Sequence, residues 1–470
     1  MVLADNLDTI AAIATPIGEG GISVIRISGP SAFATADACF RGRVKLAEAA
    51  SHTAHFGYIA DATGQRLDEV VATVFKSPHS YTGEDVVEVS CHGGAYVTQA
   101  ILSTFLSLGA RLAEPGEFTK RAFLNGKMDL SQAEAVADLI HARSGLSLRS
   151  SLSQLQGRLS EQINAVREKL IGTIGLLELE LDFAEDGYEF VEKQKAMSDL
   201  DEIIGRINKL LDTYKSGKIH RDGVKVVLAG APNVGKSSLL NQLLNENRAI
   251  VTDIPGTTRD VIEENLTING ILFRVIDTAG LRKTADVVEQ EGVARTRAKV
   301  EESDLVLLVL DASRPAEAPD IEPLSQVAKV IKEGMKACVV AVNKVDLNPT
   351  INGKLLQSMS FLKGLPIVRV SALTGHGIDE LKQTMVSSTL GGGKQAPESS
   401  VLVTNLRHFQ AIKRAKEALL LAKESLGRGE SSEFVAVDLR SALDSLGEIT
   451  GVVTTEEILN SIFSKFCIGK

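Results

Sequence analysis

Short apolar runs separated by polar and glycine-rich turns dominate the first quarter of the chain. Residues 22–27 and 70–75 are rich in valine and isoleucine, as is typical of β-strands. A stretch with a helical pattern lies between such runs, near residues 96–106. We therefore predict an α+β domain over residues 1–122.

A helical period replaces the strand pattern after this domain. Apolar residues recur every three to four positions, and no proline occurs from residue 116 to residue 231. Proline would break or kink a helix, so its absence permits long ones. Ser131 and Glu134 have the spacing of a capping box, which would begin one of these helices. We predict a first helical part over residues 123–220.

The helical pattern resumes near the C-terminus, over residues 404–427 and 432–447. Helical sequence thus flanks a central segment on both sides. We predict one all-α domain whose second part is 387–470, with the central segment 221–386 inserted into it. Insertion requires only that the two ends of the inserted domain lie close together. Two separate helical domains are the alternative.

Strand-like runs alternate with helical patterns in the central segment, with strands expected at 224–229, 272–276, 337–342 and 366–370. This alternation predicts a parallel-rich sheet with flanking helices, so the whole chain is expected to be multidomain α/β. Ligands of such sheets bind at the carboxyl ends of the strands. The residues that follow each run are therefore the first candidates for chemistry.

The loop after the first of these runs has the phosphate-binding pattern G-x-x-x-x-G-K-[ST]. Residues 230–237 read Gly-Ala-Pro-Asn-Val-Gly-Lys-Ser, between a strand-like run and a helical pattern. Glycines allow backbone N–H groups to point at phosphate oxygens, and the helix N-terminus adds positive charge. Lys236 would lie between the β- and γ-phosphates, and the Ser237 hydroxyl would bind Mg²⁺. The predicted nucleotide contacts of this loop are Asn233, Val234, Gly235, Lys236, Ser237 and Ser238.

Three further motifs each follow a strand-like run. In the first, Asp277 would hold Mg²⁺ through water and the Gly280 N–H would sense the γ-phosphate, whereas the other two indicate guanine as the base. Asp346 would accept from N1–H and the 2-amino group of guanine, two donors that adenine lacks. Lys344 would lie along the base plane, and the Ala372 N–H would donate to guanine O6. The predicted contacts are Asp277, Thr278, Ala279, Gly280, Asn343, Lys344, Asp346, Ser371 and Ala372. The central segment is therefore predicted to be a Ras-like P-loop GTPase domain, with an ATP-binding P-loop protein as the alternative.

The residues that would catalyse hydrolysis are harder to identify. Glycine, hydroxyls and charge at 252–260 favour a loop, in which Thr258 is the candidate second Mg²⁺ ligand and a plain solvated turn is the alternative. Leu281 stands where small GTPases often carry a water-positioning glutamine, and leucine cannot orient water. The acids that follow leave the choice of a substitute open. They are Asp286, Glu289 and Glu291.

Composition limits the classes of partner. The formal net charge of −9 disfavours tight nonspecific nucleic-acid binding by the whole surface, although a local basic patch stays compatible with it. None of the four cysteines forms a C-x-x-C pair, so no zinc site is indicated. We find no apolar run near 18 residues and no signal peptide, so a cytoplasmic chain without a membrane span is expected.

Motifs outside the central segment carry a resemblance to a known family. They lie at residues 80–88, 92–94, 115–118, 121–125 and, at the C-terminus, 466–470, which reads Phe-Cys-Ile-Gly-Lys. With the GTPase motifs, they make the chain resemble the bacterial tRNA-modification GTPases of the MnmE (TrmE) family over nearly its whole length. The resemblance implies a homodimer that forms a heterotetramer with the FAD-dependent protein MnmG. The pair would add a carboxymethylaminomethyl or aminomethyl group at C5 of the wobble uridine of certain tRNAs.

The resemblance also implies cofactors and residue roles. Activation by K⁺ and by pairing of GTPase domains is expected, with Glu289 orienting the attacking water. The implied K⁺ ligands are Asn233, Thr252, Ile254 and Thr257, of which Thr252 and Thr257 would also contact GTP. The one-carbon donor would be 5-formyltetrahydrofolate or a related tetrahydrofolate, bound by Arg26, Glu88, Lys127 and Lys470. Cys467 would take part in the uridine chemistry.

Two other functions share the GTPase motifs. One is a regulatory switch of the ribosome-assembly type, which does no RNA chemistry. The other is a folate-dependent one-carbon transferase that GTP only regulates. Residues 1–125 and the C-terminal Cys-Ile-Gly-Lys favour the tRNA-modifying enzyme, because a switch does not need them.

Overall fold

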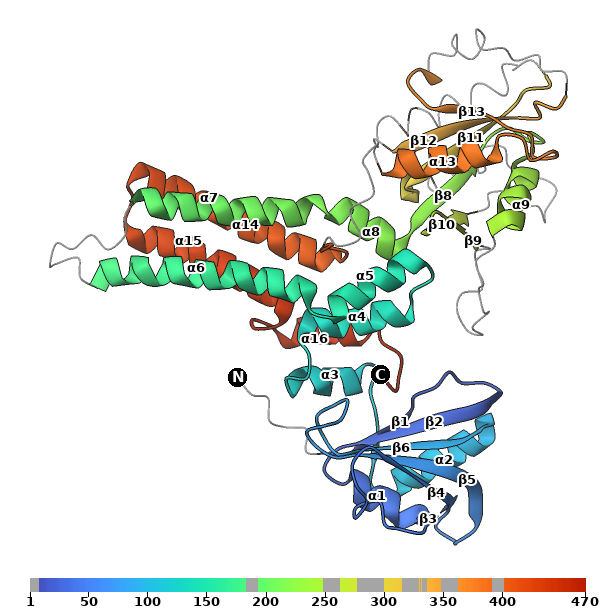
Figure 1. Ribbon diagram of the computed structural model, residues 1–470, viewed down its shortest axis with the longest axis vertical. Coiled ribbons are helices and arrows are strands. Elements are labelled where there is room, and N and C mark those ends of the chain that lie inside the picture. The colour runs from blue at the N-terminus through green and yellow to red at the C-terminus, as the bar shows by residue number, and fades with distance from the viewer. Residues whose placement is uncertain are drawn as a thin grey trace, which may run out of the picture. The chain divides into compact units, whose positions relative to one another are not determined.

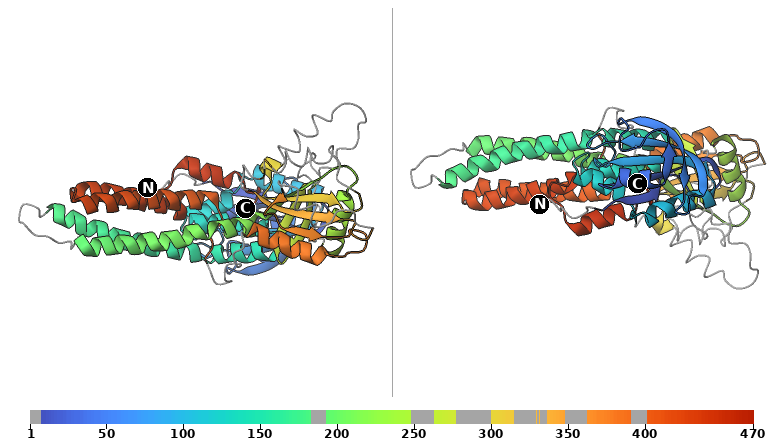
Figure 2. Two further views of the ribbon diagram at one scale, coloured as in Figure 1. Left: turned by 90° about the horizontal axis from the view of Figure 1, so that it is seen from above. Right: turned by 90° about the horizontal axis from the view of Figure 1, so that it is seen from below.

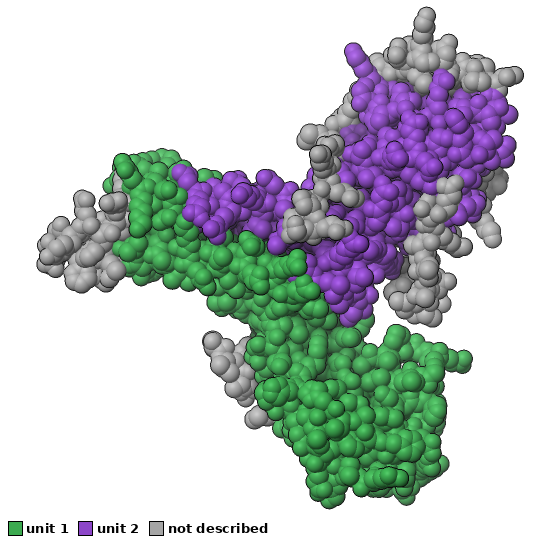
Figure 3. Space-filling model, viewed as in Figure 1, with its two compact units in different colours: residues 1–137, 154–200, 417–470 green, residues 138–153, 201–416 purple. Residues whose placement is uncertain are grey.

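A computed structural model describes residues 8–182, 193–247, 263–276, 300–314, 329, 331, 336–347, 362–390 and 401–470. The chain divides into two compact units (Figure 3). Unit 1 comprises residues 1–137, 154–200 and 417–470, and unit 2 comprises residues 138–153 and 201–416. Both units are thus assembled from segments that lie far apart in the sequence.

Unit 1 contains a seven-stranded sheet of order β3-β4-β5-β6-β2-β1-β7 (Figure 1). Neighbouring strands are antiparallel except β1 and β7, which are parallel. The strands are β1 (Ile10–Ile13), β2 (Gly20–Ser28), β3 (Phe40–Gly42), β4 (Thr53–Ala60), β5 (Arg66–Phe75), β6 (Val86–Gly93) and β7 (Arg111–Leu112). Helices α1 (Ala32–Cys39) and α2 (Ala95–Ser107) contribute to one apolar core with this sheet. The predicted α+β class of this part is confirmed.

Alternation along the strands decides which residues face that core. Ile25 and Ile27 of β2 are fully buried in it, so Arg26 between them points to the opposite face of the sheet. Glu88 of β6 lies directly opposite Arg26 in the register. The two charged residues therefore share the face away from α1 and α2.

Unit 1 also contains helices that follow the sheet along the chain. Helix α6 (Arg158–Asp182) packs along α15 (Ser432–Thr450), and Arg440 forms an ion pair with Glu178 between them (Figures 1 and 2). Helix α3 (Glu117–Leu124) contacts α16 (Glu456–Phe463). The first and last thirds of the chain thus meet in one unit.

Helix α4 (Leu130–Ile140) begins one residue before the predicted cap. The reciprocal capping bonds are made by Asp129, whose carboxylate accepts from the Gln132 N–H at 2.9 Å, and by Gln132, which accepts from the Asp129 N–H at 3.0 Å. Ser131 is fully buried inside the first turn. The predicted Ser131–Glu134 box was wrong because an aspartate two positions earlier offers the better acceptor for the free N–H groups.

Unit 2 contains a six-stranded sheet of order β13-β12-β11-β8-β10-β9. All neighbours are parallel except the β9–β10 hairpin. The strands are β8 (Val224–Ala229), β9 (Glu263–Ile268), β10 (Ile271–Ile276), β11 (Leu305–Asp311), β12 (Ala337–Asn343) and β13 (Ile367–Arg369). Helices α9 (Lys236–Asn247) and α13 (Ile378–Thr389) cover one face. The sheet is buried on both faces, as its near-continuous apolar strands require.

The chain enters and leaves this sheet at one place. Helix α8 (Tyr214–Asp222) leads through Gly223 into β8, and the returning segment enters helix α14 (Leu406–Arg428). Val403 N–H donates to the Thr213 hydroxyl at 3.0 Å, and the rings of Tyr214 and Phe409 stack at 4.2 Å. This proximity of the two connections is what an inserted domain requires, and the predicted insertion is confirmed.

Two further helices complete the described elements, α5 (Gly145–Leu155) and α7 (Lys193–Asp212). Among the helices of the described residues, none combines the length and apolar character that a membrane crossing needs.

Candidate functional site

The phosphate-binding loop joins β8 to α9 at the carboxyl edge of the unit 2 sheet. Gly235 has a φ of +93°, and a Cβ there would lie 2.3 Å from the Asn343 side-chain nitrogen. A Cβ on Gly230 would lie 2.4 Å from the Val309 carbonyl oxygen. Both glycines therefore allow a close approach of the neighbouring strands β11 and β12, a constraint that the sequence pattern did not predict.

The side chains of this loop differ in their contacts and in their exposure. The Lys236 ammonium donates to the carbonyl oxygens of Gly230 and Ala231 at 2.8 and 2.9 Å, so it lies across the loop. Ser237 and Ser238 are exposed in the first turn of α9, and Val234 is buried beneath the loop. The N-terminus of α9 faces the same edge of the sheet, which favours an anion there.

The Asn-Lys-Val-Asp segment after β12 is bonded to this loop. Asn343 is almost fully buried; its side-chain N–H donates to the Val234 carbonyl at 2.9 Å, and its side-chain oxygen accepts from the Ala372 N–H at 3.0 Å. The Ser371 hydroxyl donates to the Asp346 carboxylate at 2.6 Å. Three predicted motifs therefore meet at one edge of the sheet, held by side-chain bonds that sequence reasoning did not foresee in detail.

Several predicted site residues lie outside the described residues. They are Thr252, Ile254, Thr257, Thr258, Asp277, Thr278, Ala279, Gly280 and Glu289. Their assignments to Mg²⁺, K⁺, the γ-phosphate and the attacking water stay predictions.

A second group of predicted residues gathers on the open face of the unit 1 sheet. Arg26 pairs with Glu88 at 2.7 Å, and the two side chains are 12% and 27% exposed. The guanidinium contacts two aromatic rings, 5.1 Å from the Tyr81 centroid and 5.5 Å from that of Phe118. It also approaches the Gly469 carbonyl oxygen at 3.5 Å. The structure thus brings the C-terminus to Arg26, although the two are 443 residues apart.

The C-terminal residues are anchored on both sides. Phe463 and Phe466 are buried beside Leu130, and the Gly116 N–H donates to the Cys467 carbonyl at 3.4 Å. The Cys467 side chain itself is exposed. Lys470 is half-buried, and burial and then the neighbouring Arg26 hold the pKa of its ammonium below the ordinary value. Lys127 is exposed and donates to the Pro78 carbonyl at 3.0 Å, in the loop that carries Tyr81.

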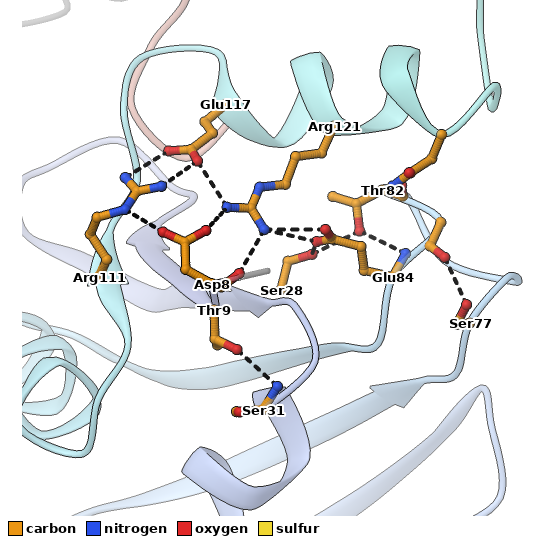
Figure 4. Close-up of polar contacts among 12 residues, drawn as sticks. Asp8, Thr9, Ser28, Ser31, Ser77, Thr82, Glu84, Arg111, Glu117 and Arg121 are labelled. Carbon is orange, nitrogen blue, oxygen red and sulfur yellow. Dashed lines mark hydrogen bonds and ion pairs between the residues drawn. The ribbon is translucent and has the colours of Figure 1, made fainter. Parts of the chain in front are cut away.

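An ionic network around the buried Arg121, beside this group, was not predicted (Figure 4). The Arg121 side chain is 3% exposed and pairs with Asp8 at 2.7 Å, Glu117 at 2.9 Å and Glu84 at 3.1 Å. Arg111 bridges Asp8 and Glu117, at 2.6 Å to each. Burial acts to raise the pKa of Glu117, but its bonds to both arginines hold it below the ordinary value.

This network positions the residues around Arg26. Arg121 and Phe118 lie on α3, and the neighbouring Thr119 hydroxyl is 2.8 Å from the Tyr81 hydroxyl. Glu84 belongs to the loop that carries Tyr81. Arg121 lies in one of the motifs on which the family resemblance rests, but no spacing rule connects it to Asp8.

Comparisons with known proteins address both units. Residues 9–127 match the family model described as GTP-binding protein TrmE N-terminus, and residues 130–467 match the MnmE helical domain. A tRNA modification GTPase MnmE of Chlorobium phaeobacteroides is 47% identical over 467 residues, which cover 98% of this chain and 97% of the relative. That of Moorella thermoacetica is 47% identical over 468 residues, covering 98% and 99%. The chain belongs to the MnmE family of tRNA modification GTPases.

Membership of the MnmE family confirms the resemblance inferred from the motifs. The similarity to the MnmE relatives covers 98% of this chain, so it is not confined to the segment that carries the GTPase motifs. A solved structure, the G domain of the T. maritima FeoB iron transporter, is 32% identical and covers 35% of this chain and 98% of that chain, with a TM-score of 0.26. That TM-score is too low to add to the description of the fold.

Proposed function

We propose that this protein hydrolyses GTP and uses hydrolysis to modify C5 of the wobble uridine in certain tRNAs. The observation that carries the first part is the junction of three motifs at one sheet edge, where Asn343 bonds both Val234 and Ala372. A phosphate-binding loop and a guanine-binding segment held together in this way define both ends of one nucleotide.

Selection of guanine follows from Asp346. The Ser371 hydroxyl fixes one carboxylate oxygen of Asp346. Guanine would satisfy this carboxylate through N1–H and the 2-amino group, whereas adenine would leave it unpaired at a large cost in binding. GTP is therefore favoured over ATP.

The metal ions would act on the phosphates. Ser237 is exposed at the start of α9 and suits Mg²⁺, with Thr258 as the second protein ligand. Asn233 would hold K⁺ together with Thr252, Ile254 and Thr257. A cation beside the phosphates would stabilise the charge that develops during hydrolysis, the part that an arginine finger plays elsewhere. Glu289 would orient the attacking water.

The Arg26 group suits a tetrahydrofolate. Arg26 and Lys470 are two cations close enough for Arg26 to lower the Lys470 pKa, and an anionic or electron-rich ligand would relieve their repulsion. Glu88 would accept from the pterin N–H edge, and Lys127 would add a further cation for the folate carboxylates. The bound 5-formyltetrahydrofolate or a related folate would supply the one-carbon unit.

The remaining parts of the proposal follow from family membership. The chain would act in the cytoplasm as a homodimer, in a heterotetramer with the FAD-dependent MnmG, and Cys467 would act in the uridine chemistry. The exposed thiol of Cys467 is accessible to a substrate.

One experiment separates this function from a regulatory switch. Wobble uridines of tRNA from cells with and without the gene are compared by mass spectrometry. Loss of a C5-substituted uridine is expected without the gene, and an unchanged profile would favour the switch.

A second experiment tests the role of K⁺. Equal GTPase rates in KCl and NaCl at matched ionic strength would remove K⁺ from the mechanism.

A further inference from the structure

An aspartate outside every nucleotide-binding motif contacts the guanine-binding segment. Asp311 is the last residue of β11, and its side chain is only 6% exposed. One carboxylate oxygen is 2.7 Å from the Lys344 ammonium. The other accepts from the Ser313 N–H at 2.9 Å and from its hydroxyl at 2.6 Å. Both oxygens of this buried carboxylate are therefore engaged.

The Lys344 ammonium has a second partner, in the phosphate-binding loop. It donates to the Asn233 carbonyl oxygen at 2.8 Å. Asp311, Lys344 and Asn233 therefore form a relay from the end of β11 through the guanine-binding segment to the phosphate-binding loop. The Ala312 N–H donates to the Asn343 carbonyl at 2.8 Å, so the backbone joins the same two strand ends.

Two members of this relay have unusual backbones. Asn233 has a φ of +62° and Lys344 a φ of +65°. Asparagine adopts this left-handed conformation more readily than other residues with a side chain, whereas a lysine needs surroundings that hold it there. The bond from Lys344 to the Asn233 carbonyl is one such constraint, and Asp311 fixes the ammonium that makes it. Removing the carboxylate would release the lysine and, through it, the Asn233 peptide.

We propose that Asp311 is a positioning residue that, through Lys344, holds the guanine-binding segment and Asn233 in their working geometry. It thereby couples binding of guanine to activation by K⁺. The coupling to K⁺ rests on the proposed function, in which Asn233 is a K⁺ ligand. The positioning of the guanine-binding segment by Asp311 does not depend on that assignment.

The test compares Asp311→Asn with Asp304→Asn. Asparagine keeps the shape of the side chain but removes its charge. Asp304 lies just before β11, where its carboxylate accepts from the Lys225 N–H at 3.0 Å, far along the strand from the nucleotide edge. Dissociation of a fluorescent GDP analogue is measured together with GTP hydrolysis as a function of KCl at saturating GTP.

Asp311→Asn should speed dissociation of the analogue by about tenfold, because a charge-assisted bond contributes more than a neutral one. The KCl concentration for half-maximal hydrolysis should rise by about threefold or more, a smaller effect because Asn233 is reached through one further bond. Asp304→Asn should change neither. A milder variant, Ser313→Ala, removes the hydroxyl bond to one carboxylate oxygen but keeps the Ser313 N–H bond and the charge, and it should shift both quantities in the same direction by less.

Each result decides one part of the proposal. Unchanged analogue dissociation in Asp311→Asn would overturn the positioning role. Faster dissociation with an unchanged KCl dependence would overturn the coupling to Asn233. If the rate of GTP hydrolysis by the wild-type protein does not change with KCl, the proposed K⁺ activation is refuted. Dissociation of the GDP analogue would still decide the role of Asp311. If Asp311→Asn fails to fold, Ser313→Ala gives the same decisions.

Discussion

Gly469 offers the sharpest test of the folate site, because the fold admits no side chain there. Its φ is +94°, and an added Cβ would lie 2.2 Å from the Ile13 carbonyl oxygen and 3.0 Å from the Ala14 Cα. These are backbone atoms of the sheet, which cannot rotate away. Gly469→Ala should therefore displace the last residues of the chain, and Lys470 with them, from Arg26.

The magnitude follows from what holds the tail. A non-glycine residue in the left-handed region costs about 1–2 kcal/mol, and the overlap with Ile13 adds to that. The opposing contact from Arg26 to the Gly469 carbonyl is long, at 3.5 Å. Displacing the last residues of the chain therefore costs less free energy than fitting an alanine beside Ile13. Loss of the Lys470 ammonium would cost about 1.5–3 kcal/mol of binding, or about a ten- to hundredfold weaker folate affinity.

The assay is titration calorimetry with 5-formyltetrahydrofolate. The matched control is Gly64→Ala, because Gly64 also has a positive φ, of +86°, but a Cβ there would meet nothing within 4 Å. The control should bind folate normally while carrying a similar backbone cost. Phe463 and Phe466 stay buried in Gly469→Ala, so its free energy of unfolding should fall by no more than about 1 kcal/mol.

Two results would refute this reasoning in different ways. Equal affinity of Gly469→Ala and wild type would mean that Lys470 makes no contact with the ligand. Absence of binding heat with the wild-type protein would remove the folate site itself.

Other substitutions test the remaining parts of the site. Asp346→Asn should weaken GTP binding by about a hundredfold or more while improving binding of xanthosine triphosphate, whose 2-oxo group matches an amide donor; nucleotide competition measures both. Arg121→Met should lower the free energy of unfolding in urea by about 2–3 kcal/mol, because Glu84 loses its cation and Asp8 and Glu117 are left with Arg111 alone, whereas Arg66→Met, at an exposed pair, should change it by less than about 1 kcal/mol. Because the pKa of Glu117 is lowered in the folded state, its carboxylate stabilises the fold at pH values above its ordinary pKa of 4.5. This stabilisation is lost as the pH falls through the folded pKa. Acid unfolding should therefore depend less on pH in Arg121→Met. Cys467→Ser should abolish tRNA modification and leave GTP hydrolysis unchanged, as measured on tRNA digests and by phosphate release.

Local motifs explain how much of the nucleotide site was predictable. The phosphate-binding loop is one continuous strand, turn and helix, so its residues and their order specify its geometry directly. The predicted strands at 224–229, 272–276 and 337–342 correspond to β8, β10 and β12. The run that forms β11 was not singled out, although six consecutive apolar residues precede Asp311. The strand that was missed is the one that supplies Asp311.

By itself, the sequence determined the order of the elements, the P-loop and guanine motifs, and membership of the MnmE family through short strings of neighbouring residues. Only the tertiary structure decided which distant residues meet. Arg26 and Gly469 lie 443 residues apart, Arg121 and Asp8 lie 113 apart, and Lys344 and Asp311 lie 33 apart. Periodicity and spacing describe one element at a time, whereas these contacts arise from where strand ends and chain termini are brought together by packing.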